Sequence, residues 1–512
     1  MTRYRHLITD ENRKWWTLGA MCFALIMVMH DNTVDNAALP SIQREIHAGI
    51  SELEWVINGY TLTFAVLIAT GGRLGDIFGR RLMFLAGVII FAITSATAGL
   101  AQDSQMLIGS RAIQGIGAAL MMPATLSIIT NAFPAHERGK AIGTWAGVSA
   151  LALSIGPLVG GFLVEHVSWR AIFFINLPVA LIAIVATLFA VRESRDRTIP
   201  RVVDLPGVAS LTVALTALVL ALIEGNSWGW GSPRVVALIA AGVLGLAAFA
   251  WIEQRVRAPM VEFSFFAERN FLGANAVAFI ISFAMLGTFF FMAIYMQDVL
   301  GYSALEAGVR FLPTTLLIVV IAPLAGRLTD RVGALIPIAT GLSILTVAMY
   351  LFSRIDATTT FSDILAPFVI MGVGIALTMS PMSTAAMNAV TQHKAGIASG
   401  ILQMSRMIGG SVGVAATGAI FQAQMGSFDP SALAAGGASA RLDFVDALGS
   451  AMGVSAVIVV AGALIAVATI RGGGRRDQAA GQPGDPVADL ASAEPAAPIT
   501  GRTGAATERI PA

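Results

Sequence analysis

The sequence predicts an all-α, polytopic membrane protein. Of its 512 residues, 56% are hydrophobic and only 12% are charged, and the mean hydropathy is +0.76. Soluble domains carry about 25% charged residues, so a chain of this length and composition could not cover a water-facing surface. Apolar runs of roughly 18–25 residues recur along the chain, and each can cross about 30 Å of hydrocarbon as a helix.

Breaks rich in charged or turn-forming residues divide these runs into fourteen expected spans. They are 16–39, 54–72, 82–101, 106–130, 139–163, 170–190, 206–223, 234–252, 270–299, 306–326, 334–353, 362–384, 396–424 and 444–470. The first run exceeds a signal-peptide core, so we expect it to be retained as a helix. Most loop arginines and lysines fall on the side of the two termini. The sequence therefore predicts a cytoplasmic (inner or plasma) membrane protein with both termini cytoplasmic.

Several classes of protein are excluded or disfavoured. A net charge of +1 gives no basic field for nucleic acid, and a single cysteine, Cys22, forms no disulfide within the chain. No phosphate-binding G-x-x-x-x-G-K-[ST] loop occurs in the sequence, and no metal-ligand cluster or nucleophile–base pair stands out. We therefore expect neither an enzyme nor a metal site.

An internal repeat divides the chain. GGRLGDIFGRR (71–81) follows the second expected span and AGRLTDRVG (325–333) follows the tenth, with identical residues at five equivalent positions. This duplication predicts two parallel six-helix bundles, with a two-helix hairpin inserted between them. The expected segments are an N-terminal segment (1–14), a first bundle (15–202), the hairpin (203–256), a second bundle (257–470) and a disordered tail (471–512).

The repeated loop is a candidate conformational latch. Its glycines permit a tight turn, its carboxylates can accept hydrogen bonds from a helix N-terminus, and its arginines can hold acidic or carbonyl partners. Contacts made in only one conformation would favour that conformation. The alternative is a turn that only sets topology. The candidate residues are Gly72, Asp76, Gly79, Arg80, Arg81 and Asp330.

Three ionisable residues lie within the first span. An ionised carboxylate near a helix centre costs about 2.5–3.5 kcal/mol on insertion scales, so Asp31 is expected to be paired, protonated or in a water-filled cavity. Asp35 lies one turn further along the same face, and two adjacent carboxylates disfavour double ionisation. The pair is a candidate proton site, which His30 could join. The alternatives are a structural Asp31, a solvated Asp35 and a packing His30.

Two further spans carry unusual residues. Arg111 in the fourth span keeps its charge and needs a carboxylate or several carbonyls. It can reach Asp31 and Asp35 only if the first and fourth spans are adjacent. Gln114 could share this network. Pro157 and its neighbouring glycines predict a bent, closely packed fifth span at the interface between the bundles, although generic packing would also explain them.

Several motifs resemble the major facilitator superfamily, and within it the fourteen-span drug:proton antiporters of EmrB/QacA type. GGRLGDIFGRR (71–81) is similar to G-x-L-x-D-x-x-G-R-R, and LIGSRAIQGIGAA (107–119) to the fourth-span R-x-x-Q-G-x-G. GVSALALSIGPLVGG (147–161) resembles the fifth-span signature that ends G-P-x-x-G-G, and DNTVDNAALP (31–40) the first-span D-x-T-I-V-N-V-A-L-P. The resemblance covers residues 16–470. Positions 30 and 35, usually apolar in that family, are His and Asp here.

The resemblance implies the major facilitator fold and alternating access coupled to proton entry, with export of hydrophobic and often cationic drugs. The proton motive force would drive it without a cofactor. Asp31 and Arg111 would have proton-linked roles. A conformational role would fall to the fifth-span motif of Gly156, Pro157, Gly160 and Gly161. Some relatives carry an acid within the tenth span, and residues 311–322 contain none, which disfavours export of divalent cations.

The substrate cavity is the least specific part of the prediction. Adaptable and aromatic side chains suit a drug pocket. The candidates are Gln114, Met122, Phe290, Tyr295, Met379 and Arg406. The alternatives are an exporter of one endogenous metabolite, antibiotic or lipid, a proton-coupled importer, and a receptor that transports nothing. The sequence does not identify an accessory protein.

Overall fold

The computed structural model describes residues 9, 12–195, 202–256, 259, 261–356, 359–390, 395–425 and 438–471. In these ranges the regular secondary structure is entirely helical. Most of the N-terminal segment expected at 1–14, and all of the expected tail except Arg471, lie outside the described residues.

The described part of the chain consists of long helices joined by short connections. In order they are α1 (Arg13–Ile46), α2 (Ile50–Phe78), α3 (Arg80–Gly99), α4 (Ser104–Ala132), α5 (Ala135–His166), α6 (Ala171–Phe174), α7 (Asn176–Ala190), α8 (Leu205–Trp228), α9 (Pro233–Glu253), the 3₁₀ helix η1 (Phe263–Ala267), α10 (Arg269–Ile294), the π-helix η2 (Tyr295–Val299), α11 (Ala304–Val332), α12 (Leu335–Phe352), α13 (Phe361–Asn388), α14 (Ala395–Met425) and α16 (Ala438–Thr469).

The lengths and composition of these helices suit a membrane. In the described part of the chain, eleven helices are long and apolar enough to cross a bilayer, with α6 and α7 together forming one of them. α1 makes a twelfth if its two segments, which meet at 42°, are taken as one span. The remaining long helices are α5 and α14, with 32 and 31 residues. The chain is therefore a multi-pass membrane protein.

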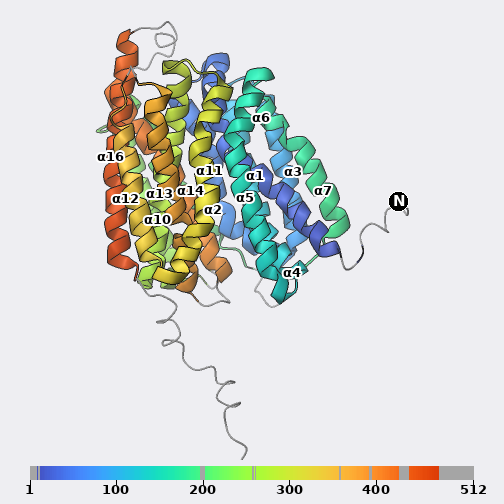
Figure 1. The fold of residues 1–512 in the computed structure, drawn as a ribbon. Coiled ribbons are helices and arrows are strands. Elements are labelled where there is room, and N and C mark those ends of the chain that lie inside the picture. Colours follow the sequence, from blue (N-terminus) through green and yellow to red (C-terminus); the bar gives the residue numbers. More distant parts are fainter. Residues whose placement is uncertain are drawn as a thin grey trace, which may run out of the picture.

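The same helix pairs recur in the two repeats. α2 packs on α4, α3 on α4 and α1 on α5, and correspondingly α11 packs on α13, α12 on α13 and α10 on α14. We call α1–α7 the N-terminal set and α10–α16 the C-terminal set. Figure 1 shows α3, α5, α6 and α7 on one side of the molecule and α10, α12, α13 and α16 on the other. The sets meet through α5 with α11 and α2 with α14, and α8 lies against α9, α2 and α14.

The contacts between the sets include several near one end of the molecule. This is the end opposite the start of α1 and the finish of α16, and we call it the opposite end. There the backbone amide of Leu305, in the first turn of α11, donates to Glu165 Oε2 in the last turn of α5, at 3.0 Å. Deeper in the interface, Ser411 Oγ of α14 donates to Asn58 Oδ1 of α2. The N- and C-terminal sets are thus joined on this side of the bundle.

α2 and α4 are brought together by close backbone contact. A Cβ added at Gly115 of α4 would lie only 2.6 Å from the carbonyl oxygen of Tyr60 in α2, so a larger residue would force these helices apart. The turn from α2 to α3 uses Gly79 at φ +126°, a conformation that L side chains rarely adopt. This packing sets polar residues of α1, α2 and α4 against one another inside the bundle.

Candidate functional site

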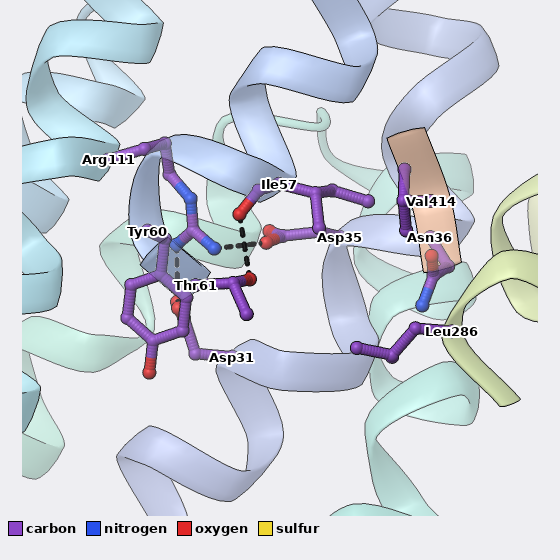
Figure 2. Close-up of a pocket in the computed structure, with 9 residues that line it drawn as sticks. All are labelled: Asp31, Asp35, Asn36, Ile57, Tyr60, Thr61, Arg111, Leu286 and Val414. Carbon is purple, nitrogen blue, oxygen red and sulfur yellow. Dashed lines mark hydrogen bonds and ion pairs between the residues drawn. The ribbon is translucent and has the colours of Figure 1, made fainter. Parts of the chain in front are cut away.

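The site is built around Arg111 of α4, whose side chain is 1% exposed. Its Nη1 lies 2.6 Å from Asp31 Oδ2, and its Nη2 lies 2.5 Å from Asp35 Oδ2. The two aspartates are one turn apart on α1 and face α4 together, as their spacing predicts. The planar guanidinium thus holds both carboxylates at once, which an ammonium group could not do with the same geometry (Figure 2).

Further polar groups surround Asp31. Arg111 also donates to Gln114 Oε1 at 2.8 Å, and the amide of Gln114 donates to Asp31 Oδ1 at 3.2 Å. Asn176, near the start of α7, donates to the same oxygen at 3.5 Å and to Ser95 Oγ at 3.0 Å. Both oxygens of Asp31 therefore have donors, and four helices share one buried network.

Aromatic and backbone groups complete the enclosure of the arginine. The guanidinium carbon lies 4.4 Å from the centre of the Tyr60 ring and 5.8 Å from that of Phe173. Its Nε donates to the carbonyl oxygen of Val56 at 3.3 Å. Cation–π contacts and a carbonyl acceptor partly replace the water that a buried arginine loses. The positive charge is consequently fixed in place between α1 and α2.

The charges of this cluster do not balance when both acids are ionised. Two carboxylates and one guanidinium then carry a net charge of −1, and one bound proton makes the cluster neutral. Asp35 Oδ1 is buried and has no hydrogen-bond partner, whereas Asp35 Oδ2 is held by Arg111. A proton on Oδ1 would satisfy both the charge and the geometry of the cluster.

A small cavity adjoins the cluster at the boundary between the two helix sets. Asp31, Asp35, Asn36, Ile57, Tyr60, Thr61 and Arg111 line it from the N-terminal set, and Leu286 of α10 and Val414 of α14 from the C-terminal set (Figure 2). A change in the charge of these acids would therefore act directly on the contact between the two sets.

His30 is buried beside Asp31 but is not hydrogen-bonded into this network. Its Nε2 has no partner among the described residues. Its carbonyl oxygen accepts from Thr33 Oγ1, and both residues lie against Gly156 of α5. The structure therefore places His30 where α1 packs on α5.

The glycines of the fifth-span motif lie in two interfaces. Added Cβ atoms would meet Thr33 Oγ1 at 2.0 Å from Gly156 and the side chain of Val34 at 2.7 Å from Gly160. On another face of α5, a Cβ at Gly161 would lie 2.5 Å from the carbonyl oxygen of Ala304 in α11. α5 continues through Pro157 as a single helix, so a kink there stays a prediction. The small residues let α5 contact both α1 and the C-terminal set.

The described contacts of the first copy of the repeated loop, residues 71–81, are made with the N-terminal set and with the segment that follows α7. Asp76 pairs with Arg80 at 2.9 Å, and Arg81 donates to the carbonyl oxygen of Leu188 at 3.1 Å. Gly72 packs against Pro123 of α4. The amides of Arg81 and Leu82 donate to Glu193, a residue that the sequence analysis did not single out. The side chain of Asp330 lies outside the described residues. A latch between the sets stays a prediction.

The six cavity candidates are not gathered at one place. Gln114 belongs to the charged network, while Phe290 and Tyr295 are buried in the C-terminal set. Tyr295 donates to the carbonyl oxygen of Asp356 at 3.1 Å. Met122 is buried, and Met379 and Arg406 are half-buried. None of the six lines the cavity beside Asp35.

Comparison with known proteins decides the family. Residues 21–414 match the Major Facilitator Superfamily. The chain belongs to this superfamily. It is 35% identical over 420 residues to the tetracenomycin C resistance and export protein of Streptomyces glaucescens, covering 82% of this chain and 78% of that one. It is 36% identical to the multidrug resistance protein Stp of Mycobacterium tuberculosis strain H37Rv, over 80% of this chain and 76% of that protein.

Other relatives agree with this assignment. The puromycin resistance protein pur8 of Streptomyces alboniger is 37% identical over 79% of this chain and 81% of its own. Among solved structures, an inward-facing bacterial homologue of the human lysosomal transporter Spinster superposes with a TM-score of 0.66. It covers 89% of this chain and 97% of its own, at 18% identity, and so supports the fold. As a member of the major facilitator superfamily, the chain is a transporter and not an enzyme.

The sequence did not predict three groups of this site, namely the Asn176 amide, the Val56 carbonyl and the Tyr60 ring. Asn176 is a polar residue within an apolar run, a signal that could have identified it. The Val56 carbonyl and the Tyr60 ring carry no such signal, because their roles depend on how α2 packs against α4.

Proposed function

We propose that this protein exports small hydrophobic, cationic drugs or antibiotics across the cytoplasmic membrane, by alternating access in exchange for protons. The observation that carries the proposal is the buried cluster of Asp31, Asp35 and Arg111, which is one proton short of neutrality. Such a cluster binds one proton readily, and its charge changes when the proton leaves.

The coupling step uses the boundary between the two helix sets. Asp31 is fixed by Arg111, Gln114 and Asn176, so Asp35 Oδ1 is the oxygen available to take the proton. The neutral cluster suits the closed contact with Leu286 and Val414. After proton release, the excess negative charge favours hydration and separation of the sets, and it attracts a cationic substrate.

The relatives support resistance and export rather than import. Three of them are named for tetracenomycin C export, multidrug resistance and puromycin resistance. We infer a substrate of similar kind for this chain. The energy source is the proton motive force, with no cofactor, and lipids surround the helices.

The topology proposed with this function has fourteen spans, with α5 and α14 added to the twelve candidates. α8 and α9 form the inserted hairpin between bundles at 15–202 and 257–470. The arginines and lysines near the two termini support a cytoplasmic location for both ends. The opposite end, where Glu165 meets Leu305, then faces outward.

Transport in inside-out vesicles tests the proposal. With an acidic interior, antiport draws a fluorescent lipophilic cation into the vesicle as protons leave. We expect gradient-driven uptake in the unaltered protein and its loss in both Asp31→Asn and Asp35→Asn.

The matched control is Asp443→Asn, which removes an exposed carboxylate of α16. It should transport normally. Uptake that persists in both cluster variants would exclude these acids as the coupling site. Failure of the unaltered protein to move any cation, with neutral or anionic compounds transported instead, would exclude the cationic substrate class.

A further inference from the structure

A second buried acid lies outside the charged cluster, where the two helix sets and α8 meet. Glu54, in the second turn of α2, is 0% exposed. It faces α14, where a Cβ added at Gly418 would lie 1.8 Å from Glu54 Oε1. Any side chain at position 418 would therefore displace the carboxyl group. The absence of a side chain at 418 leaves the space that this acid occupies.

The polar contacts of Glu54 are few. The amide of Gln422 on α14 lies 3.5 Å from Glu54 Oε1 and also 3.5 Å from Ser51 Oγ. Glu54 Oε2 is buried and has no hydrogen-bond partner. A carboxylate oxygen in this state would be neither hydrated nor paired, which is unfavourable for an ionised group.

The charges around Glu54 do not compensate an ionised carboxylate either. In the described part of the chain, no arginine, lysine or histidine pairs with it. The titratable group that faces it is Glu224 of α8, which has the same sign, and α14 presents the neutral Gln422. The neutral carboxylic acid, with its proton on Oε2, fits this environment.

Glu54 is also the outermost acid of a polar line along the contact between α2 and α14. Glu54, Asn58 and Thr61 share one face of α2 because they are four and then three residues apart. Ser411 of α14 donates to Asn58 Oδ1, while Asn58 Nδ2 is buried without a partner. Thr61 reaches the cavity that also contains Asp35 (Figure 2). The line thus connects Glu54 with the charged cluster over roughly 10 Å along the helix.

We propose that Glu54 is a second proton-binding site, which takes a proton from the opposite end of the molecule and holds it while α2 and α14 are in contact. The proton binds to Oε2 and leaves the carboxyl group neutral. When the two helices separate, water reaches the carboxyl group and the proton can dissociate. The physiological role of this site rests on the proton-coupled export proposed above, whereas proton binding by Glu54 does not.

α8 has a defined part in this arrangement. Asn226 of α8 donates to the carbonyl oxygen of Ala419, at 2.5 Å, next to Gly418. α8 packs on both α2 and α14, with Glu224 half-buried close to Glu54. α8 thus lies beside Glu54 at the contact between α2 and α14. In the proposed arrangement it shields this acid, so that its proton exchanges when α2 and α14 separate.

Infrared difference spectroscopy on the purified full-length protein tests proton binding without a substrate. Spectra recorded as the pH is changed report the carbonyl stretch of each protonated acid that titrates. We expect one such band to disappear in Glu54→Gln and to persist, shifted in frequency, in Glu54→Asp. The control is Glu52→Gln, which removes a hydrogen-bonded acid two residues away and should leave the band unchanged. An identical set of bands in Glu54→Gln would overturn the proposal.

Pulsed electron paramagnetic resonance tests the link to conformation. Spin labels at Gln102 and Gln424, which are exposed at the opposite end on the two helix sets, report their separation in a Cys22→Ser background. In the unaltered protein we expect acidification to increase the short-distance population. In Glu54→Gln this pH response should be reduced, with a larger short-distance population at high pH, because only the charged cluster still titrates, and in Glu54→Asp the full response should return.

The outcomes separate this proposal from the proposed function. A pH response that is unchanged in Glu54→Gln but lost in Asp31→Asn would place proton coupling in the charged cluster alone and refute the role of Glu54. A response reduced in Glu54→Gln and restored in Glu54→Asp would support that role even if vesicle transport of cations failed.

Discussion

Arg111 offers the sharpest test of how the charged cluster is stabilised. Replacing it by Met removes the only cation hydrogen-bonded to Asp31 and Asp35 among the described residues, and leaves two carboxylates buried together. Removal of one partner from a buried ion pair costs about 3–5 kcal/mol. Because one guanidinium holds two acids, we expect the loss of stability in Arg111→Met to lie at the upper end of this range, unless one of the acids takes up a proton.

Compensating substitutions sharpen the prediction. In the triple variant Asp31→Asn, Asp35→Asn, Arg111→Met, no charge is buried, and stability should return to within about 1–2 kcal/mol of the unaltered protein, since neutral replacements of buried ion pairs are often tolerated. The three changes should therefore be strongly non-additive. The stability of Arg111→Lys should fall between that of Arg111→Met and that of the triple variant, because an ammonium group lacks the planar fork that reaches both acids.

The assay is equilibrium unfolding of the purified protein in mixed micelles, with the free energy of unfolding measured for each variant. Asp443→Asn, at an exposed position on α16, should leave this free energy within about 0.5 kcal/mol of the original. A loss below about 1 kcal/mol in Arg111→Met, or a triple variant no more stable than Arg111→Met, would refute the reasoning.

Two further predictions concern helix contacts. In Gly161→Ala the new Cβ would lie 2.5 Å from the Ala304 carbonyl oxygen, so overpacking of about 1–3 kcal/mol should oppose closure of the opposite end. Cysteine labelling at that end should become roughly tenfold faster, whereas Gly147→Ala, with no atom within 4 Å of its Cβ, should behave normally. Glu193→Ala removes the acceptor for the first amides of α3, including that of Leu82. This variant should reduce the free energy of unfolding by about 0.5–1 kcal/mol and leave the cation affinity unchanged. A loss of cation-binding free energy that exceeds the loss of unfolding free energy would contradict a purely structural role of Glu193.

The sequence identified the charged residues of the cluster but not that they meet. The one-turn spacing of Asp31 and Asp35 predicts a shared helix face, and Arg111 is a permanent charge that requires an acid or carbonyls nearby. Their meeting depended on contact between α1 and α4, which periodicity does not reveal. The structure supplies that contact and adds Asn176 and the Val56 carbonyl.

Glu54 shows why some buried groups escape a reading of the sequence. The second span was expected to begin at residue 54, which would place this acid at the edge of the membrane. α2 begins four residues earlier, at Ile50, and α14 and α8 cover its first turns. A charged residue near a helix end is ordinarily solvated, so only its neighbours reveal that this one is buried.

Composition and hydropathy by themselves determined that the chain is a helical, multi-pass membrane protein, because lipid requires every backbone polar group to be satisfied within a helix. The repeated loop and the intramembrane charges pointed to the superfamily and to the acids of α1. The tertiary structure alone decided which charges neutralise one another, that Asp35 Oδ1 and Glu54 Oε2 are left without partners, and that both lie where the helix sets meet. Pairing and burial are properties of neighbours brought from distant parts of the chain, and the order of residues does not specify those neighbours directly.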